Sequence, residues 1–518
     1  MTAITAPNIG DALRRRRERR ARALVPFVLG AAGVLGLGAG KLAAADHPTL
    51  ILGLAAIPIL MAIWRWPHSG VLMVLAMATT IEQFTYYAGS HQGVFTSRIP
   101  LFASATKGAG ISLAEMLIGL VVAVWIMKGA VRHDWNTPRS PVAKTLIVYM
   151  GLVVLAVGVG MSRGGKMQVI LYEVRPWTYL AVAYLLTASL LRSRSAIRAI
   201  LWTIVIGTGF KAVQGLFMSL QVRHEPIPVE LILSHEESFF FGIFLLLTLG
   251  LWTFGVKGRM RAVATTLAPI VLYADMANAR RTAWAILGTT LVMFFALAYS
   301  ALPARRRALR RKAVVVLALS ALYFPVFWNS AGTLGQPARA LHAQFSPDPR
   351  DLSSNLYRVQ EDANLAYNIR QTAGLGKGFG PLIDYALPIT DISKIDAFIT
   401  FLPHNSVLDL WMRLGTQGMV VFLMLLAAAV FRASALTRSG DQDYAVLGLV
   451  AVCAVVAYVV QGSSDMGFFW FRIALCLGTL LGTVEAAHRL LPRGDRDEPA
   501  AAVAPTVAEG DPEPVPMG

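Results

Sequence analysis

Histidine and carboxylate side chains stand where long apolar runs of this chain begin. The stretch FLPHNSVLDLW (401–411) places His404 and Asn405 between a long polar segment and an apolar run. A histidine with an ordinary pKa of about 6.5 can accept a proton at neutral pH. We therefore predict that His404 orients or deprotonates an attacking hydroxyl group as a general base. Asn405 is expected to cap the helix that follows, because its side-chain oxygen can accept a bond from a free backbone N–H.

Arginine side chains occupy comparable positions at the ends of other apolar runs. Arg223 lies just beyond one run, Arg280 and Arg281 form the pair in NARRT, and Arg175 lies in EVRPW. The guanidinium group is always charged and donates forked hydrogen bonds that match phosphate. We predict that Arg223, Arg280 and Arg281 bind a diphosphate group. Arg175 is assigned to the same group, and a lipid-headgroup contact or a structural ion pair is its alternative.

Other polar residues are candidates for supporting the acceptor or the loops around it. They are Asn405, Glu236, Glu237, Arg358 and Lys377. The two glutamates begin an apolar run and offer a second way to activate an acceptor. GLGKGFG, which contains the lysine, lacks the spacing of a nucleotide-binding P-loop, so we predict a flexible turn there. No Asp/His cluster has the spacing of metal ligands, so no metal and no other cofactor is predicted.

The composition places these residues in a polytopic membrane protein. Of 518 residues, 55% are apolar by type and 15% are charged, against about 25% charged in soluble domains. Apolar runs of the roughly 17–25 residues that cross a membrane recur along the chain, so the predicted fold is all-α, with about 12–14 transmembrane helices and one large loop that carries short helices. The excess of Lys and Arg falls in short loops between spans, so it does not indicate a nucleic-acid partner.

The predicted spans divide the chain into membrane and loop regions. They begin near Leu24, Thr49, Val71, Ser112, Ala143, Trp177, Ala199, Phe239, Val263, Ala283, Ala313, Asn405, Tyr444 and Phe468. Loops rich in Lys and Arg alternate with loops that are not, and the basic set should face the cytoplasm. We predict a basic cytoplasmic tail (1–23), spans 1–11 (24–328), a large periplasmic loop (329–403), spans 12–14 (404–490) and a disordered cytoplasmic tail (491–518). Both termini would then be cytoplasmic.

Residues 353–374 of the large loop have the spacing of an amphipathic helix. One face of this helix collects Leu356, Val359, Ala363, Ala366 and Ile369, as a period of 3.6 residues requires. Its charged residues, Glu361 among them, lie largely elsewhere. We expect serines at the start to cap this helix, Gly374 to end it, and the helix to lie across the outer end of the spans.

Three segments resemble the O-antigen ligase and O-antigen polymerase superfamily. They are LGKGFGPLIDY, the later HNSVLDLWMRLGTQGMVVFLMLL, and NARRTAWAILGTTLVMF, all within residues 167–426. Gly415 and Gly418 match the paired glycines that follow the His-Asn block in that family. Arg413 stands where members often carry glutamate, which leaves the handling of the acceptor open.

The resemblance implies a multi-span enzyme of the GT-C type in the bacterial inner membrane. Such an enzyme moves a glycan from undecaprenyl diphosphate to an acceptor hydroxyl by a metal-independent, inverting reaction. On this pattern His404 matches the catalytic histidine, Arg280 or Arg281 the arginine of the short motif, and Arg223 the arginine of the preceding outer loop. The partners implied are the lipid-linked glycan donor, a glycan or lipid acceptor, membrane lipids and other polysaccharide-assembly proteins.

Several functions remain open at this point. A polymerase, a lipid A-core ligase and a protein O-oligosaccharyltransferase differ only in the acceptor, and the number of spans favours polymerase or polysaccharide assembly. A transporter or flippase is the alternative from another class. It would place charged or helix-breaking sites at the membrane midplane in paired repeats, whereas the polar groups here collect at the outer ends of spans.

Overall fold

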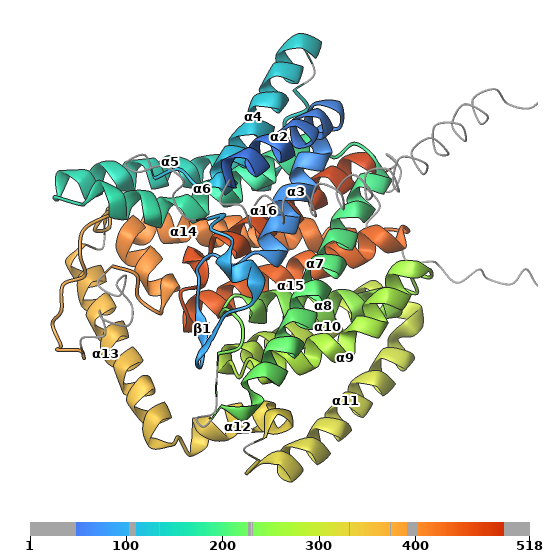
Figure 1. Cartoon of the computed structure of the whole chain (residues 1–518), viewed down its shortest axis with the longest axis vertical. Coiled ribbons are helices and arrows are strands. Elements are labelled where there is room, and N and C mark those ends of the chain that lie inside the picture. The colour runs from blue at the N-terminus through green and yellow to red at the C-terminus, as the bar shows by residue number, and fades with distance from the viewer. Residues whose placement is uncertain are drawn as a thin grey trace, which may run out of the picture. The chain divides into compact units, whose positions relative to one another are not determined.

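The computed structural model describes residues 48–102, 110–133, 135–225, 229, 231–330, 332–372, 374–390 and 401–491, as Figure 1 shows. Its contacts divide the chain into two compact units, residues 1–70 and 71–518, and each is described by itself. The described part of the first unit contains α2 (Pro48–Arg65) and the beginning of α3 (Pro67–Thr80). The predicted span near Leu24, the N-terminal tail 1–23 and nearly all of the predicted tail 491–518 lie outside the described residues.

The second unit is built almost entirely of helices. Its main helices are α4 (Leu113–Arg132), α5 (Pro141–Ser162), α6 (Met167–Leu190), α7 (Arg194–Gln221), α8 (Glu237–Thr253), α9 (Arg259–Ala277), α10 (Arg281–Ala301), α11 (Arg306–Phe327), α14 (Ser406–Leu436), α15 (Gln442–Ser464) and α16 (Phe471–Leu490). Two further helices, α12 (Gln336–Phe345) and α13 (Pro349–Gln371), lie between α11 and α14. In the part of the chain that the structure describes, the strands are the short pair β1 (Tyr87–Ala88) and β2 (His91–Gln92).

Seven described helices are long and apolar enough to cross a membrane. They are α4, α5, α7, α10, α14, α15 and α16. The chain is therefore an all-α protein of the membrane-embedded type, because a helix satisfies its own backbone polar groups inside lipid. Every predicted span after the first falls on a described helix, but only these seven have the length and hydropathy of a span, so the number of 12–14 stays a prediction.

The loops that are less dense in Lys and Arg meet at one end of the bundle, the end at which α14 begins, which we call the His404 end. Tyr86 Oη donates to Ile232 O at 3.0 Å. Leu233 N donates to Asn278 Oδ1 at 2.9 Å, which joins the start of α8 to the end of α9. Helices that run alternately up and down bring these same helix ends together.

The basic loops meet at the other end, which we call the Arg305 end. Arg305 Nη1 donates to Thr253 O at 2.7 Å, and Arg194 Nη2 lies 2.9 Å from Asp441 Oδ2. The two sets of loops that differ in charge are thus also separate in space. This grouping agrees with the predicted parity of the spans.

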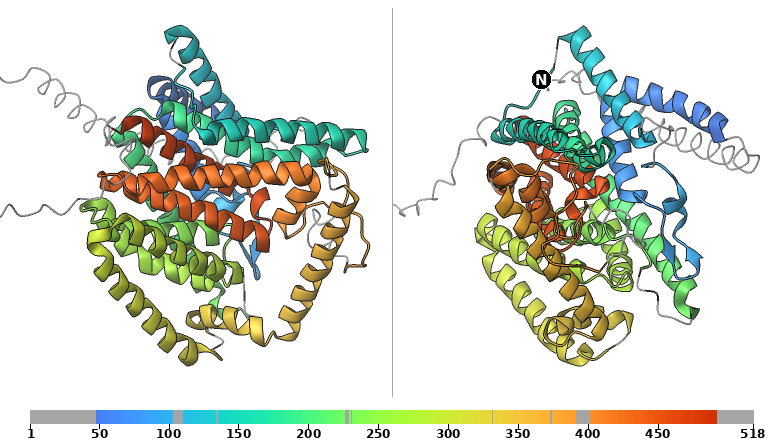
Figure 2. Two further views of the ribbon diagram at one scale, coloured as in Figure 1. Left: turned by 180° about the vertical axis from the view of Figure 1, so that it is seen from behind. Right: turned by 90° about the vertical axis from the view of Figure 1, so that its left-hand side faces the viewer.

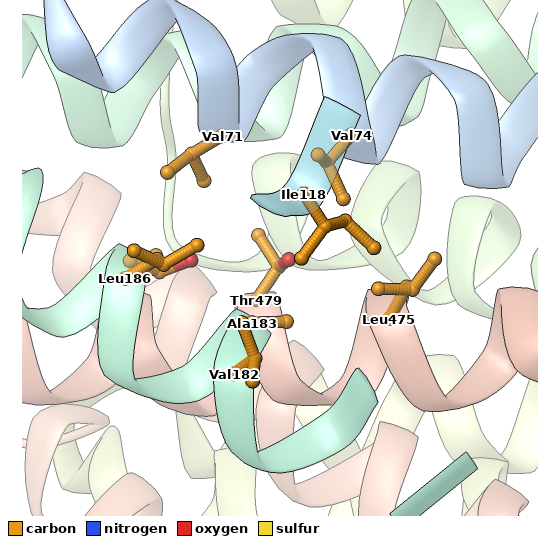
Figure 3. Close-up of a pocket in the computed structure, with 9 residues that line it drawn as sticks. Val71, Val74, Ile118, Val182, Ala183, Leu186, Leu475 and Thr479 are labelled. Atoms are coloured by element: carbon orange, nitrogen blue, oxygen red, sulfur yellow. The ribbon is translucent and has the colours of Figure 1, made fainter. Parts of the chain in front are cut away.

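Small residues allow α6 and α16 to pack closely. A Cβ atom at Gly478 would lie 2.3 Å from Leu180 O, and one at Gly482 would lie 2.6 Å from Tyr184 O. This GxxxG spacing is typical of close helix pairs in membranes. A small crevice beside the pair, between α3, α4, α6 and α16, is lined almost wholly by apolar side chains (Figure 3). It contains no acid or base, so the chemistry must be sought elsewhere.

The segment GLGKGFG packs tightly against α14, so the prediction of a flexible turn is wrong. A kink at Gly415, whose φ is 69°, frees backbone carbonyl groups in α14. Lys377 N donates to Met412 O at 2.7 Å, and Gly378 N donates to Arg413 O at 3.0 Å. Gly378 has a φ of 78°, a conformation that glycine adopts without steric cost.

A helix forms where the amphipathic one was predicted, but α13 is longer and starts earlier. Asp348 caps it and accepts a bond from Asp351 N at 2.7 Å, in place of the expected serines. Leu356 and Val359, from the predicted apolar face, are exposed, whereas Glu361 is buried. Figure 2 shows α12 and α13 on the outside of the bundle, with α13 reaching the N-terminal start of α14. The face of α13 that meets the protein therefore carries Glu361 and also Leu365, which is 0% exposed and packs in one cluster with Met412.

Candidate functional site

His404 is paired with a carboxylate from α13. Its Nδ1 lies 3.2 Å from Glu361 Oε2, and its backbone N–H donates to the same oxygen at 3.0 Å. The imidazole also meets the ring of Tyr357 edge to face, with 5.8 Å between the centroids. The His404 side chain is 23% exposed and that of Glu361 is 4% exposed. The carboxylate therefore holds one ring nitrogen, and Nε2 is the nitrogen that a hydroxyl group can approach.

The start of α14 fixes the backbone of the histidine. Asn405 Oδ1 accepts a bond from Leu408 N at 3.2 Å, which confirms the predicted N-cap. The next residue, Ser406, donates from Oγ to Asp465 O at 3.2 Å and accepts from Phe468 N at 3.4 Å. His404 therefore lies beside a fixed helix start, which is tied to the turn after α15.

Two opposing effects set the pKa of His404. Burial of the ring lowers this pKa, but the hydrogen bond and the charge of Glu361, together with the charge of Asp465, outweigh burial. The pKa of His404 therefore lies above its ordinary value. A base with a raised pKa binds a proton more firmly. It acts as a base only at a pH at which it is neutral before the reaction.

A second histidine–carboxylate pair lies beside the first. His235 Nδ1 is 3.1 Å from Asp465 Oδ2, and the imidazole lies 6.3 Å from the ring of Trp470. Burial raises the pKa of Asp465, but the charge of His235 and its hydrogen bond lower it more, so the net pKa is well below the usual range. Because the charge of His404 also lowers the pKa of Asp465, the two pairs are electrostatically connected.

Arg281 and His404 both contact α13. Arg281 Nη1 lies 3.4 Å from Asp351 Oδ1 and donates to Asn355 Oδ1 at 3.3 Å. Asn355 and Glu361 are separated by roughly 9 Å along the helix axis, from the rise of about 1.5 Å per residue. Arg280 immediately precedes α10 as its N-cap residue. Arg281 and His404, which lie far apart in the sequence, are thus both brought to α13.

Arg223 and Arg175 are placed differently. Arg223 lies exposed in a short 3-10 turn after α7. Among the described residues, no ion pair connects it to α13 or to His404. Arg175 Nε lies 3.0 Å from Glu115 Oε1, and the guanidinium also donates to Gly110 O. The geometry of Arg175 is that of a structural ion pair, which was its alternative interpretation.

Glu236 and Glu237 are buried in the bundle, contrary to the expectation that they support an acceptor. Arg472 Nη1 lies 2.6 Å from Glu237 Oε1 and 3.4 Å from Glu236 Oε2, and all three side chains are 0% exposed. A buried carboxylate requires such a partner, because removing its charge from water is costly. An acceptor at the surface cannot reach either glutamate in this structure.

Arg358 and Lys377 have supporting positions. The charge of Arg358 lowers the pKa of His404, although less than Glu361 raises it. Lys377 Nζ donates to Asn368 Oδ1 at 2.8 Å and lies 2.7 Å from Asp384 Oδ2. Burial lowers the pKa of Lys377. These contacts tie the glycine-rich segment to α13.

Arg413 lies near the His404 end, where it donates to Phe401 O at 3.0 Å, but it is buried. Its guanidinium is 0% exposed and lies 2.7 Å from Glu173 Oε1 and 3.3 Å from Asp409 Oδ1. It also donates to Pro381 O at 2.6 Å. Arg413 therefore joins α14 to α6 and to the loop after α13.

The residues that sequence reasoning missed are Glu361, Tyr357, His235 and Asp465. Glu361 was visible only as a charged residue of the amphipathic helix, and Asp465 lies in the loop before the last predicted span without any motif around it. In the described ranges no group of three His, Cys, Asp or Glu side chains could hold a metal ion. Neither the protein-family models nor the curated proteins match this sequence.

Proposed function

We propose that this chain is a membrane glycosyltransferase that moves a glycan from a polyprenyl-diphosphate carrier to an acceptor hydroxyl group. The observation that carries the proposal is the His404–Glu361 pair, with Nδ1 held at 3.2 Å, at one end of a helical membrane bundle. The contact of Arg281 with the same helix supplies a cation for the diphosphate. The resemblance to the O-antigen ligase and polymerase superfamily supports the same assignment.

His404 activates the acceptor in this mechanism. Glu361 accepts the Nδ1–H of the neutral imidazole, which leaves the lone pair of Nε2 for the acceptor O–H. As Nε2 takes this proton, the acceptor oxygen forms a bond to the anomeric carbon from the face opposite the diphosphate. The bond between that carbon and the diphosphate oxygen breaks, and the lipid diphosphate leaves with the electron pair. The configuration at the anomeric carbon is inverted.

Arginines stabilise the leaving group. Negative charge grows on the diphosphate as the glycosidic bond breaks, and fixed cations at that place lower the barrier. Arg281 and the adjacent Arg280 fill this role, and the exposed Arg223 completes the clamp once a donor is bound. Arg175 is left out, because its contacts with Glu115 and Gly110 do not bring it to α13. The chain's own side chains supply every group in this scheme.

The sidedness of the membrane follows from the basic loops. The Arg305 end carries the loops dense in Lys and Arg, so we assign it to the cytoplasm of a bacterial inner membrane and the His404 end to the periplasm. Cysteine variants at Ser346 and Ala308, both exposed, test this orientation in intact cells. An impermeant thiol reagent should label the variant at Ser346 and spare the one at Ala308. The reverse pattern contradicts the proposed function.

A transporter or flippase is the second candidate, and one observation favours it. Lys211 of α7 is buried and paired with Glu82, near the cluster of Arg472 with Glu237. Charges inside a membrane bundle often mark transport pathways. Lys211 and Arg472 are neutralised by these glutamates, however, so neither cation is left to bind a cargo. We therefore rank transport below glycosyl transfer.

The deciding experiment uses purified protein and a synthetic polyprenyl-diphosphate glycan. The expected result is a new glycan product and free lipid diphosphate when a candidate acceptor is added, without added metal. Testing a second copy of the donor, a lipid A-core and a peptide hydroxyl separates the polymerase, ligase and protein O-oligosaccharyltransferase alternatives. Equal product from wild type and His404→Asn would falsify the assignment of the site.

A further inference from the structure

The helices α12 and α13 expose a continuous apolar stripe. The stripe consists of Phe345, Leu352, Leu356, Val359 and Ala363. Phe345 is 75% exposed, Val359 is 66% exposed and Leu356 is 54% exposed. An amphipathic helix in a loop surrounded by water turns its apolar face toward the protein. This stripe faces away from the protein, so a medium other than water is required to cover it.

Hydrogen bonds on the opposite face prevent α13 from rolling over. Glu361 holds His404, as described above. Asn364 Nδ2 donates to Leu387 O at 2.9 Å, and Asn368 Nδ2 donates to Asp384 O at 2.8 Å. Burying the stripe against the bundle would break all of these bonds. The outward orientation of the stripe is thus set by the polar residues of the same helix together with Leu365, which is buried in a cluster with Ile383 and Met412.

The stripe continues an apolar surface on α11. Leu319, Leu322 and Val326 are exposed along that helix. Trp328 follows at its end, where its ring lies 4.9 Å from that of His342 and 6.4 Å from that of Phe345. Tryptophan at the end of an apolar helix is typical of the boundary between membrane and water. A single surface therefore leads from α11 through α12 onto α13.

Basic side chains accompany the stripe, and the acidic groups of α13 are occupied. Arg339, Arg358 and Arg370 are partly or fully exposed on the two helices. Of the three acidic residues in α13, Asp351 is engaged by Arg281, Glu361 by His404 and Asp362 by Asn405. Apolar residues flanked by cations are the pattern of a helix that lies in a membrane surface among phosphate headgroups.

We propose that α12 and α13 lie in the membrane surface at the His404 end, with the stripe in contact with the acyl chains of that leaflet. Lipid is favoured over a protein partner because the stripe is continuous with α11 and flanked by cations. With α13 fixed in this way, Arg281 and His404 are held at the depth of lipid headgroups. The inference concerns membrane contact alone and does not depend on glycosyl transfer.

Fluorescence quenching tests this contact. A bimane label is attached to a single cysteine at Val359, in the stripe, or at Ser346, an exposed polar position in the turn between the two helices. The native Cys453 and Cys476 are buried, so the label should react with the introduced cysteine alone. The full-length protein is reconstituted in phosphatidylethanolamine/phosphatidylglycerol vesicles with brominated acyl chains. We expect brominated lipid to quench the Val359 label several-fold more than the Ser346 label, and aqueous iodide to show the reverse.

Two outcomes overturn the proposal. Strong iodide quenching and weak lipid quenching at Val359 would mean that the stripe faces water. Weak quenching by both agents, with cross-links between copies at Val359, would mean that a second copy covers it. A label at Leu356, one turn earlier, repeats the measurement if the Val359 variant does not fold.

Discussion

Two ion pairs at the His404 end, one centred on a histidine and one on an arginine, differ in their environment. His404 lies 3.2 Å from Glu361, and Arg472 lies 2.6 Å from Glu237. The histidine is 23% exposed and the arginine is 0% exposed. Burial therefore separates a pair that a substrate can reach from a pair that only the protein can use.

The cation also differs in what it can do. An arginine stays protonated at any physiological pH, so Arg472 serves as a permanent counter-charge for Glu236 and Glu237. A histidine gains and loses its proton near neutral pH, so a carboxylate beside it tunes a base. The comparison teaches that the role of a carboxylate depends on the cation beside it and on how exposed the pair is, which the residue type alone does not specify.

Removing His404 should produce the largest change in activity. His404→Ala should lower the rate of transfer by about 10²–10⁴-fold, the usual contribution of a general base. The protein should remain folded and still bind the lipid-linked donor through its arginines. Rates with purified protein, together with donor binding, check this expectation. His404→Asn keeps the chain polar and should lose a similar amount, and full activity of that variant would assign the histidine to structure.

Removing Arg472 should produce the largest change in stability. Arg472→Ala leaves two carboxylates buried without their counter-charge, which should destabilise the fold by about 3–5 kcal/mol. Thermal unfolding of the purified protein in detergent measures this loss. His404→Ala serves as the matched control and should unfold near the wild-type temperature. Equal melting temperatures for all three proteins would remove the distinction between the pairs.

Arg281→Ala should reduce transfer by about 10²-fold, because one fixed donor to a developing charge has that effect. Arg281→Lys should recover little, since a point charge does not replace a forked contact. A loss of activity in Arg281→Ala has a second explanation, which is the loss of the contact between Arg281 and α13. Asp351→Asn tests this explanation, because it weakens the same contact without removing the cation. If Asp351→Asn loses as much activity as Arg281→Ala, the arginine acts by positioning α13.

Glu361→Gln should shift the pH profile with the smallest loss of rate. The acceptor step needs a neutral His404, so wild-type activity should fall as the pH drops through the raised pKa of that residue. Glutamine removes the charge that raises this pKa. The pKa of His404 should then fall, and the acid limb of the profile should move to lower pH. An unmoved acid limb would show that another group controls it.

Much of the architecture could be predicted because it depends on local chemistry. Helices form where apolar runs are long, since lipid gives the backbone no other partner. The cap at Asn405 also follows from the residue type at a helix start. The segment GLGKGFG was misread, because its packing depends on the carbonyls that the kink at Gly415 frees far along the chain.

The sequence by itself determined the membrane class, the helices and the parity of the loops, since all three depend on hydropathy and charge along the chain. Only the tertiary structure decided that Glu361 meets His404, that Asp465 meets His235, and that Glu236 is buried. These contacts join residues far apart in the chain. The apolar face of α13 was readable from its spacing, but the direction in which it points was not. The spacing of apolar residues shows which face of a helix avoids water, and beside a membrane both the protein and the lipid satisfy that requirement.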